Sequence, residues 1–174
     1  MALGVCLLFD DRGETAIRQL WDRIEAYGIP TLRSHTHGNH HAHLSYTVLV
    51  EWQLDPVREA LTELGPGGPI ELSFQAVGVF PRGRISLIPA VPPELLSRQR
   101  AVNEAVTAAG ATVHRHYRSG RWLPHSSLAP RARLSQLPEV AAAVNDLLPL
   151  TVSVPRAGLI DAATGRLWPL RYVP

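Results

Sequence analysis

The chain has 174 residues, of which 45% are apolar and 18% are charged, and its formal net charge is +2 at pH 7. This composition excludes an intrinsically disordered chain and suits one domain over residues 1–174. All 17 basic side chains are arginine, and the absence of lysine excludes Walker-A phosphate binding, Schiff-base catalysis and a lysine-adenylate intermediate.

The first nine residues form an apolar run without a basic residue, and Asp10 and Asp11 follow it directly. We therefore expect neither a signal peptide nor a membrane span here, and a cytoplasmic location. The single cysteine, Cys6, lies in this run. It excludes an internal disulfide and a Cys-x-x-Cys pair for zinc or redox chemistry, and we expect it to be an inert core residue.

Hydrophobic periodicity and turn residues predict the same order of elements twice. In the first half they predict a strand at 3–10, a helix at 14–27, a histidine-rich loop at 32–42, a strand at 43–52, a helix at 55–64 and strands at 70–80 and 84–90. In the second half they predict a helix at 94–109, a strand at 122–129, a helix at 134–148 and strands at 150–160 and 166–173.

The two halves, approximately residues 1–91 and 92–174, therefore form an internal repeat. Each copy is too small to bury a sheet face by itself. We expect an α+β fold in which the two repeats form two lobes about a pseudo-twofold axis, within a single domain.

Each half begins its central strand with a His-x-Ser motif, His43-Leu44-Ser45 and His125-Ser126-Ser127. Alternation along a strand places the histidine and serine of each motif on one face, and the pseudo-twofold axis brings both pairs to a shared groove. Two imidazoles suit in-line displacement at phosphorus, because one can serve as base and the other as acid near neutral pH. The serine hydroxyls can donate to the non-bridging oxygens. This chemistry needs neither a metal nor another cofactor.

The two motifs, 82 positions apart and at equivalent points of a repeat, resemble the hallmark of the two-histidine (2H) phosphoesterase superfamily, the 2′-5′ RNA ligase-like proteins. The stretch at residues 122–129 is the most similar. The resemblance implies a duplicated bilobal fold, with two antiparallel-sheet lobes and outer helices around a central groove. It also implies a metal-independent phosphodiesterase that opens RNA or nucleotide 2′,3′-cyclic phosphates to 2′-phosphates, with reversible 2′-5′ RNA ligation in which a 5′-hydroxyl takes part.

The same resemblance implies roles for the motif residues. His43 would be the acid that protonates the departing O3′, and His125 the base for the attacking water. Ser45 and Ser127 would complete the catalytic set. Pseudo-symmetry leaves the exchange of the two histidine roles open.

Two arginines are candidates for substrate binding. Many family members place an arginine directly after the Leu-Ala that follows the second motif, whereas here Pro130 intervenes and Arg131 comes one residue late. Arg131 can clamp a phosphate only if the strand continues through the proline. Arg121 ends a basic stretch at residues 114–121, which either contacts an RNA backbone or is a solvated loop.

Aromatic residues near the motifs leave two interpretations open. Tyr46 and Trp122 are further candidates for substrate binding, although strand alternation points both toward the core. Phe74 and Phe80 share one strand face and are expected mainly in the core, with one of them at the groove edge able to stack on a base.

Five histidines fall within nine residues at positions 35–43. A metal site is one interpretation, but no cysteine is nearby and no regular element fixes the geometry of the ligands. We favour a loop at the rim of the substrate site that gains positive charge below neutral pH, with a solvated loop without a role as the other possibility.

The expected partners are RNA ends or cyclic nucleotides as substrates, with no membrane, and the chain is expected to be a monomer. One alternative function is a member of the same fold that binds an RNA end or nucleotide without turnover. Another is a metal-binding or structural protein built on the histidine loop.

We expect hydrolysis of a 2′,3′-cyclic phosphate to survive an excess of EDTA, because the expected chemistry uses imidazole and hydroxyl groups alone. Initial rates of the purified, untagged protein with and without chelator check this expectation. Loss of turnover that one specific divalent ion restores would contradict it and favour the metal interpretation.

Overall fold

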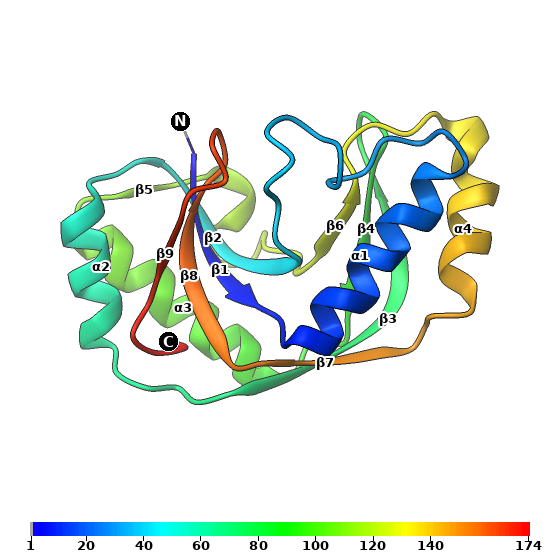
Figure 1. Ribbon diagram of the computed structural model, residues 1–174. Helices are drawn as coiled ribbons and strands as arrows, with labels where there is room; N and C mark the ends of the chain where they lie inside the picture. Colours follow the sequence, from blue (N-terminus) through cyan, green and yellow to red (C-terminus); the bar gives the residue numbers. More distant parts are fainter. Residues whose placement is uncertain (1) are drawn as a thin grey trace.

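A computed structural model describes residues 2–174 (Figure 1). Its helices are α1 (Asp11–Glu25), α2 (Leu54–Glu63), α3 (Pro93–Ala108) and α4 (Leu137–Asn145), with short 3-10 helices η1 (Arg115–Tyr117) and η2 (Leu134–Gln136). Its strands are β1 (Leu3–Leu8), β2 (His43–Glu51), β3 (Ile70–Phe80), β4 (Arg84–Pro89), β5 (Thr112–Val113), β6 (Ser126–Ala129), β7 (Leu150–Val154), β8 (Arg156–Asp161) and β9 (Leu167–Pro169).

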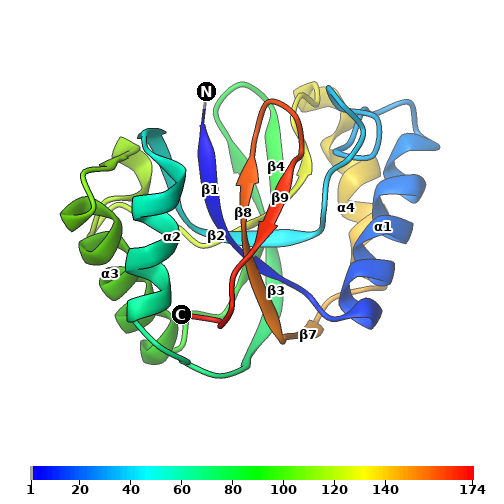
Figure 2. The same cartoon turned by 60° about the vertical axis from the view of Figure 1, so that its left-hand side comes forward.

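The strands form two antiparallel sheets. One has five strands in the order β5-β2-β1-β8-β9, and the other has four strands in the order β6-β4-β3-β7. Helices α2 and α3 cover the outer side of the first sheet, and α1 and α4 cover the outer side of the second (Figures 1 and 2). The expected α+β fold of two antiparallel-sheet lobes with outer helices is confirmed.

Each sheet takes strands from both halves of the sequence. The chain passes from the four-stranded sheet to the five-stranded sheet at Pro155, between β7 and β8. The prediction of one strand over residues 150–160 is therefore wrong, because a proline lacks the N–H that a ladder needs. The halves at about 1–91 and 92–174 contribute to both lobes rather than forming one lobe each.

The buried face of α1 follows the predicted helical period, with Ile17, Leu20, Trp21 and Ile24 in the core. This helix begins at Asp11, three residues before the predicted start at residue 14. The Asp10 side chain caps it by accepting a hydrogen bond from the Gly13 backbone N–H at 3.0 Å. The helix axis is thereby fixed directly after β1, which is buried along its whole length.

The second motif is preceded by irregular chain rather than by the strand predicted from residue 122. Strand β6 begins only at Ser126, after Pro124, which cannot donate to a ladder. The short elements β5 and η1 were not predicted, and the helix predicted at residues 134–148 is divided into η2 and α4. His125 therefore stands at the entrance to a strand.

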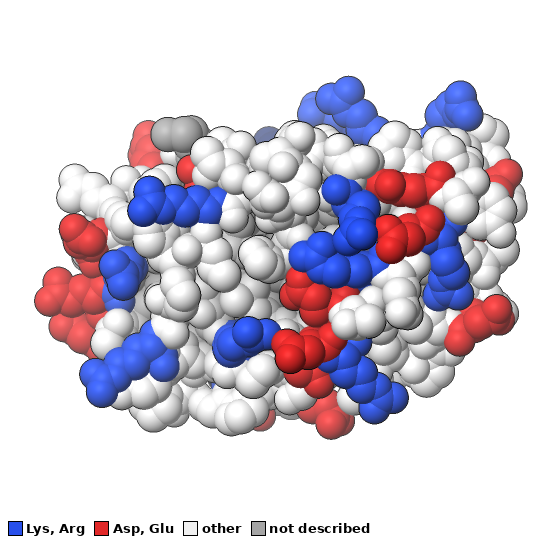
Figure 3. All heavy atoms as spheres, in the orientation of Figure 1, with Lys and Arg blue, Asp and Glu red and all other residues white. Residues whose placement is uncertain are grey.

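The surface carries both signs of charge. On the face drawn in Figure 3, arginines are interspersed with aspartates and glutamates, and no single sign dominates it. Within residues 2–174, the model contains no helix whose length and hydropathy would let it cross a bilayer.

Candidate active site

The first motif lies at the start of β2. His43 and Ser45 are half-buried on one face of this strand, while Leu44 and Tyr46 are buried on the other, as the alternation predicts. Cys6 of β1 pairs opposite Ser45, and its Sγ lies 3.5 Å from the Ser45 Oγ. The cysteine is buried, but it borders the motif rather than lying in an inert part of the core.

The second motif has the same arrangement on the other sheet. Ser127 lies in β6, His125 immediately precedes this strand, and Ser86 of β4 pairs opposite Ser127. Ser86 thus occupies the position that corresponds to Cys6. The two motifs are alike in backbone setting and differ in the side chain placed beside the serine.

Both imidazoles are oriented by the same hydrogen bond. The Nδ1 of His43 contacts the His41 carbonyl oxygen at 2.8 Å, and the Nδ1 of His125 contacts the Leu123 carbonyl oxygen at 2.8 Å. A carbonyl oxygen only accepts, so each Nδ1 carries the proton in this arrangement. The Nε2 of each ring is left as the atom that can gain or lose a proton.

A cavity of about 820 Å³ lies beside the second motif. His125, Ser127 and Ser86 line it, together with residues of the 3-10 helix η1 and of the turn before β4. Its charged or titratable lining consists of His35, Arg82, Arg84, His114, Arg115, His116, Tyr117, Arg121 and His125. No carboxylate is among these described lining residues, so the cavity is suited to an anion.

His43 and Ser45 adjoin this cavity through residues that line it. The indole N–H of Trp122 donates to the Ser45 carbonyl at 3.1 Å. The Ser45 side chain also acts on the Tyr117 hydroxyl, whose pKa it lowers. The two motifs are therefore neighbours, as the pseudo-twofold axis predicts, with the first more deeply buried.

The protonated form of His43 is favoured. Burial opposes a charge on this imidazole, but the Cys6 sulfur, the His41 carbonyl and the Glu14 carboxylate favour it, and the net effect raises its pKa to about 9. At neutral pH this ring is therefore cationic.

The neutral form of His125 is favoured instead. Burial lowers its pKa, and the hydrogen bond to the Leu123 carbonyl partly opposes this effect. The positive charges of His43 and Arg84 lower the pKa further. The Phe80 ring lies beside it, with 5.2 Å between the ring centroids. The two imidazoles thus differ in charge although their hydrogen bonds match.

The other predicted residues divide into two groups. Arg121, Trp122 and Phe80 line the cavity, while Phe74 is buried in the core. Tyr46 is fully buried, so the prediction that it binds substrate is wrong, and strand alternation gives the reason.

Arg131 does not line the cavity. Strand β6 ends at Ala129, so Pro130 interrupts the alternation before it can place Arg131 on the groove side. The structure does not bring this exposed arginine to the motifs, and its predicted role as a phosphate clamp is not supported.

Arg84, rather than the predicted Arg131, places a guanidinium group at the cavity. It is the first residue of β4, it lines the cavity, and its charge reaches His125, His114 and Tyr117. The preceding Gly83 has φ 71°, and a Cβ there would overlap the Ala132 carbonyl, so only glycine allows this close turn. The Pro81-Arg82-Gly83 turn was the available signal, but it predicts a hairpin and not a site.

Cys6 was missed as a residue of the site, whereas Tyr117 belongs to the stretch at residues 114–121 that was considered for RNA contact. Burial and Cys6 raise the pKa of Tyr117 to about 12, against the opposite effects of Ser45 and Arg84, so its hydroxyl keeps its proton. It can therefore act as a hydrogen-bond donor toward the cavity. Cys6 carries no sequence signal for this position, because it reaches the motif through β1.

The histidine-rich loop is anchored beside the cavity, where His35 contributes to the lining. Arg18 of α1 donates to the His40 carbonyl at 2.9 Å, and the rings of His37 and His40 lie 4.2 Å apart. Burial and then His37 lower the pKa of His40 to about 4, so this ring does not gain charge just below neutral pH. Residues 2–174 contain no group of three or more His, Cys, Asp or Glu side chains placed to hold a metal ion.

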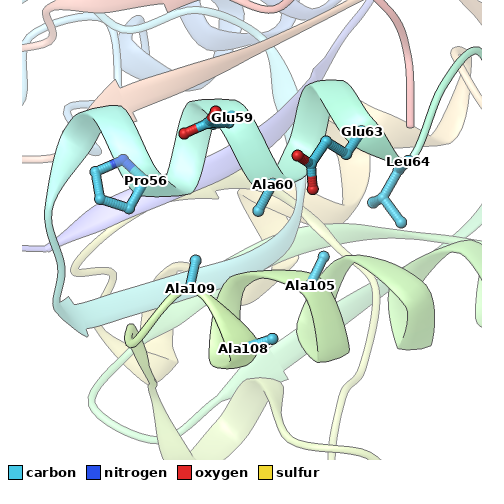
Figure 4. A pocket seen from close by; sticks show the side chains of 8 residues that line it. All are labelled: Pro56, Glu59, Ala60, Glu63, Leu64, Ala105, Ala108 and Ala109. Carbon is cyan, nitrogen blue, oxygen red and sulfur yellow. The ribbon is translucent and has the colours of Figure 1, made fainter.

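A second cavity, of about 430 Å³, lies between α2 and α3 on the outer side of the five-stranded sheet (Figure 4). Alanines of both helices and the carboxylates Glu59 and Glu63 line it. It contains neither motif, and its carboxylates would repel the anions that suit the first cavity.

Comparison with known proteins identifies the class that this fold and site define. The sequence model of the family described as the 2′-5′ RNA ligase superfamily matches residues 11–166 of this chain. The chain belongs to this superfamily, which is the 2H phosphoesterase class expected from the two motifs. No curated protein matches the chain.

Solved structures show the same fold at low sequence identity. E. coli LigT complexed with 3′-AMP has a TM-score of 0.63 and 15% identity, covering 97% of this chain and 94% of that chain. A protein described as a phosphoesterase has a TM-score of 0.59 and 12% identity, with the same coverage of the two chains. Kluyveromyces marxianus Usb1 with uridine monophosphate has a TM-score of 0.52 and 12% identity, and the match covers 97% of each chain. These similarities confirm the bilobal fold.

We expect Arg84→Ala to weaken binding of inorganic phosphate about tenfold or more, because a hydrogen bond to a charged group contributes about 1.5 to 3 kcal/mol. The matched variant Arg131→Ala removes the same side chain outside the cavity and should change affinity by less than about twofold. Isothermal titration calorimetry at constant ionic strength measures both. Equal losses in the two variants would show that net charge, rather than a site at Arg84, controls the affinity.

Proposed function

We propose that this protein is a metal-independent phosphodiesterase that opens 2′,3′-cyclic phosphates at RNA ends or on nucleotides to 2′-phosphates, and that attack by an RNA 5′-hydroxyl in place of water gives reversible 2′-5′ ligation. The observation that carries the proposal is the matched pair of Nδ1 hydrogen bonds, each 2.8 Å long, on His43 and His125. They leave the Nε2 of His125 for proton transfer at a cavity suited to an anion, and the Nε2 of His43 for proton transfer in the adjoining motif. An acid and a base held in this way suit one displacement at phosphorus.

In the proposed step, the neutral His125 takes a proton from water at Nε2 while the water oxygen bonds to phosphorus. The P–O3′ bond breaks, and the protonated His43 gives its Nε2 proton to O3′. The product is a 2′-phosphate with a free 3′-hydroxyl. Ser45 and Ser127 donate to the non-bridging oxygens, and Arg84 balances their charge.

The charges around the two rings support this assignment of roles. His43 lies near the Cys6 sulfur and the Glu14 carboxylate, which favour its protonated form, whereas Arg84 disfavours a charge on His125. An acid needs a proton to give and a base needs a vacant nitrogen. Pseudo-symmetry alone does not choose between the rings, and their surroundings favour His43 as the acid and His125 as the base.

The expected substrate is a nucleotide or an RNA end. LigT and Usb1, which share the fold, have solved structures with 3′-AMP and with uridine monophosphate, respectively. The cavity of this chain offers four arginines for phosphate and the Phe80 ring for a base. At about 820 Å³ it lies within the range of small-molecule sites.

We expect His43→Ala and His125→Ala each to lower kcat by about 10² to 10⁴, since each removes one proton-transfer group. The double variant should lose less than the product of the two, because both groups act in one step. A substrate with an activated leaving group no longer needs an acid and should rescue His43→Ala only. Rates on the four nucleoside 2′,3′-cyclic phosphates, with the product isomer identified, provide the measurement.

Three outcomes are informative. Rescue of His125→Ala instead would exchange the two roles. Single variants that keep more than about a tenth of the wild-type kcat would contradict the two-histidine mechanism. Tight nucleotide binding by a wild-type protein that turns over none of these substrates or cyclic-phosphate RNA ends would favour the binding-only alternative.

The pH profile of kcat/KM should be bell-shaped. His125 must be neutral, so the rate falls as the pH drops through its lowered pKa, below 6.5. His43 must be protonated, so the rate falls as the pH rises through about 9. A rate that still rises at pH 10 would contradict the requirement for a protonated acid.

A further inference from the structure

Trp122 links the two motifs directly. It stands three residues before His125, and its indole N–H donates to the carbonyl of Ser45, on the other sheet, at 3.1 Å. Its ring also lies against the ring of Tyr46, with centroids 6.3 Å apart and an interplanar angle of 47°. One side chain of the His125 segment is therefore anchored on two adjacent residues of the strand that carries His43.

Strand pairing does not provide such a link. Strands β2 and β6 lie against each other but belong to different sheets and do not pair (Figure 1). At the first motif β2 pairs with β1 alone, since β5 reaches β2 only at Leu49 and Glu51. The relative position of the motifs consequently depends on side chains that cross between the sheets.

We propose that Trp122 is a positioning residue, whose indole N–H fixes the separation between the two His-x-Ser motifs. This inference rests on the proposed function. The expectation that Trp122 binds substrate changes accordingly, because its one hydrogen-bond donor is used by Ser45. The residue acts through the strand it holds and not through contact with the reacting atoms.

Alignment across phosphorus makes this separation important. The acid and the base must reach opposite sides of one phosphorus atom, and a misplacement of about 1 Å can cost about 10²-fold in rate. Removing the indole N–H also leaves the Ser45 carbonyl without this donor, which favours a shift of the strand. The shift would move Ser45 and His43 relative to His125.

A second indole provides a matched control. Trp21 of α1 donates its N–H to the carbonyl of Ser127, the serine of the other motif, at 3.3 Å. Its helix packs on β6 and β7 of the same sheet, so this bond lies within one lobe. Pairing of Ser127 with Ser86 holds the motif in place independently of the helix.

The test compares Trp122→Phe with Trp21→Phe, which both keep an aromatic ring and remove one N–H donor. For Trp122→Phe we expect kcat to fall about 10- to 100-fold with KM within about twofold of wild type, and an activated leaving group should not restore the rate. For Trp21→Phe we expect a lower melting temperature with kcat within about threefold of wild type. Steady-state kinetics and thermal unfolding of both variants provide the data.

Two results would overturn the inference. A raised KM with unchanged kcat in Trp122→Phe would indicate a substrate contact instead. Equal losses of kcat in both variants would indicate a general effect on stability. If Trp122→Phe does not fold, a naphthylalanine at this position keeps a bicyclic ring without the N–H and should show the same fall in kcat.

The proposed function and this inference can fail separately. Absence of turnover in the wild-type protein would contradict the function. In that case, crystal structures of the two variants report the motif spacing directly. The distance between the His43 and His125 rings should differ from wild type in Trp122→Phe and not in Trp21→Phe, and an unchanged distance in Trp122→Phe would contradict the inference.

Discussion

The site depends on one repeated constraint, the hydrogen bond from each histidine Nδ1 to the carbonyl oxygen two residues earlier. These bonds, to His41 and to Leu123, are both 2.8 Å long. They fix the tautomer of each ring and leave Nε2 as the atom that can exchange a proton. The short backbone segments that precede β2 and β6 therefore determine the chemistry, and the two sheets hold these segments side by side.

The two motifs share a backbone arrangement, but the side chains around them differ. Opposite the motif serines, β1 presents Cys6 and β4 presents Ser86. Of the two motif histidines, His125 is the one whose pKa the positive charge of Arg84, at the start of β4, lowers. Two equivalent imidazoles could also hold one proton between them, but either ring could then carry it. The different surroundings favour the proton on His43 and the vacant Nε2 on His125, in line with the proposed roles.

Much of this arrangement could be predicted from the sequence, because the repeat and the motifs are local patterns. Alternation correctly placed His43 and Ser45 on one face of a strand, and the repeat correctly predicted two similar sheets. Contacts between distant elements could not be predicted. Arg84 reaches the site from the start of β4 and Tyr117 from a 3-10 helix. Pro155 moves the chain from one sheet to the other, where periodicity predicts one strand.

The most direct test of this account is the separate titration of His43 and His125 by NMR, following the ring Hε1 and Cε1 signals in the free protein from pH 4 to 10. Each signal is assigned from the spectrum of the corresponding His→Gln variant. The account predicts a pKa of about 9 for His43 and a pKa below 6.5 for His125. Equal values for the two rings, or the reverse order, would contradict the assignment of acid and base.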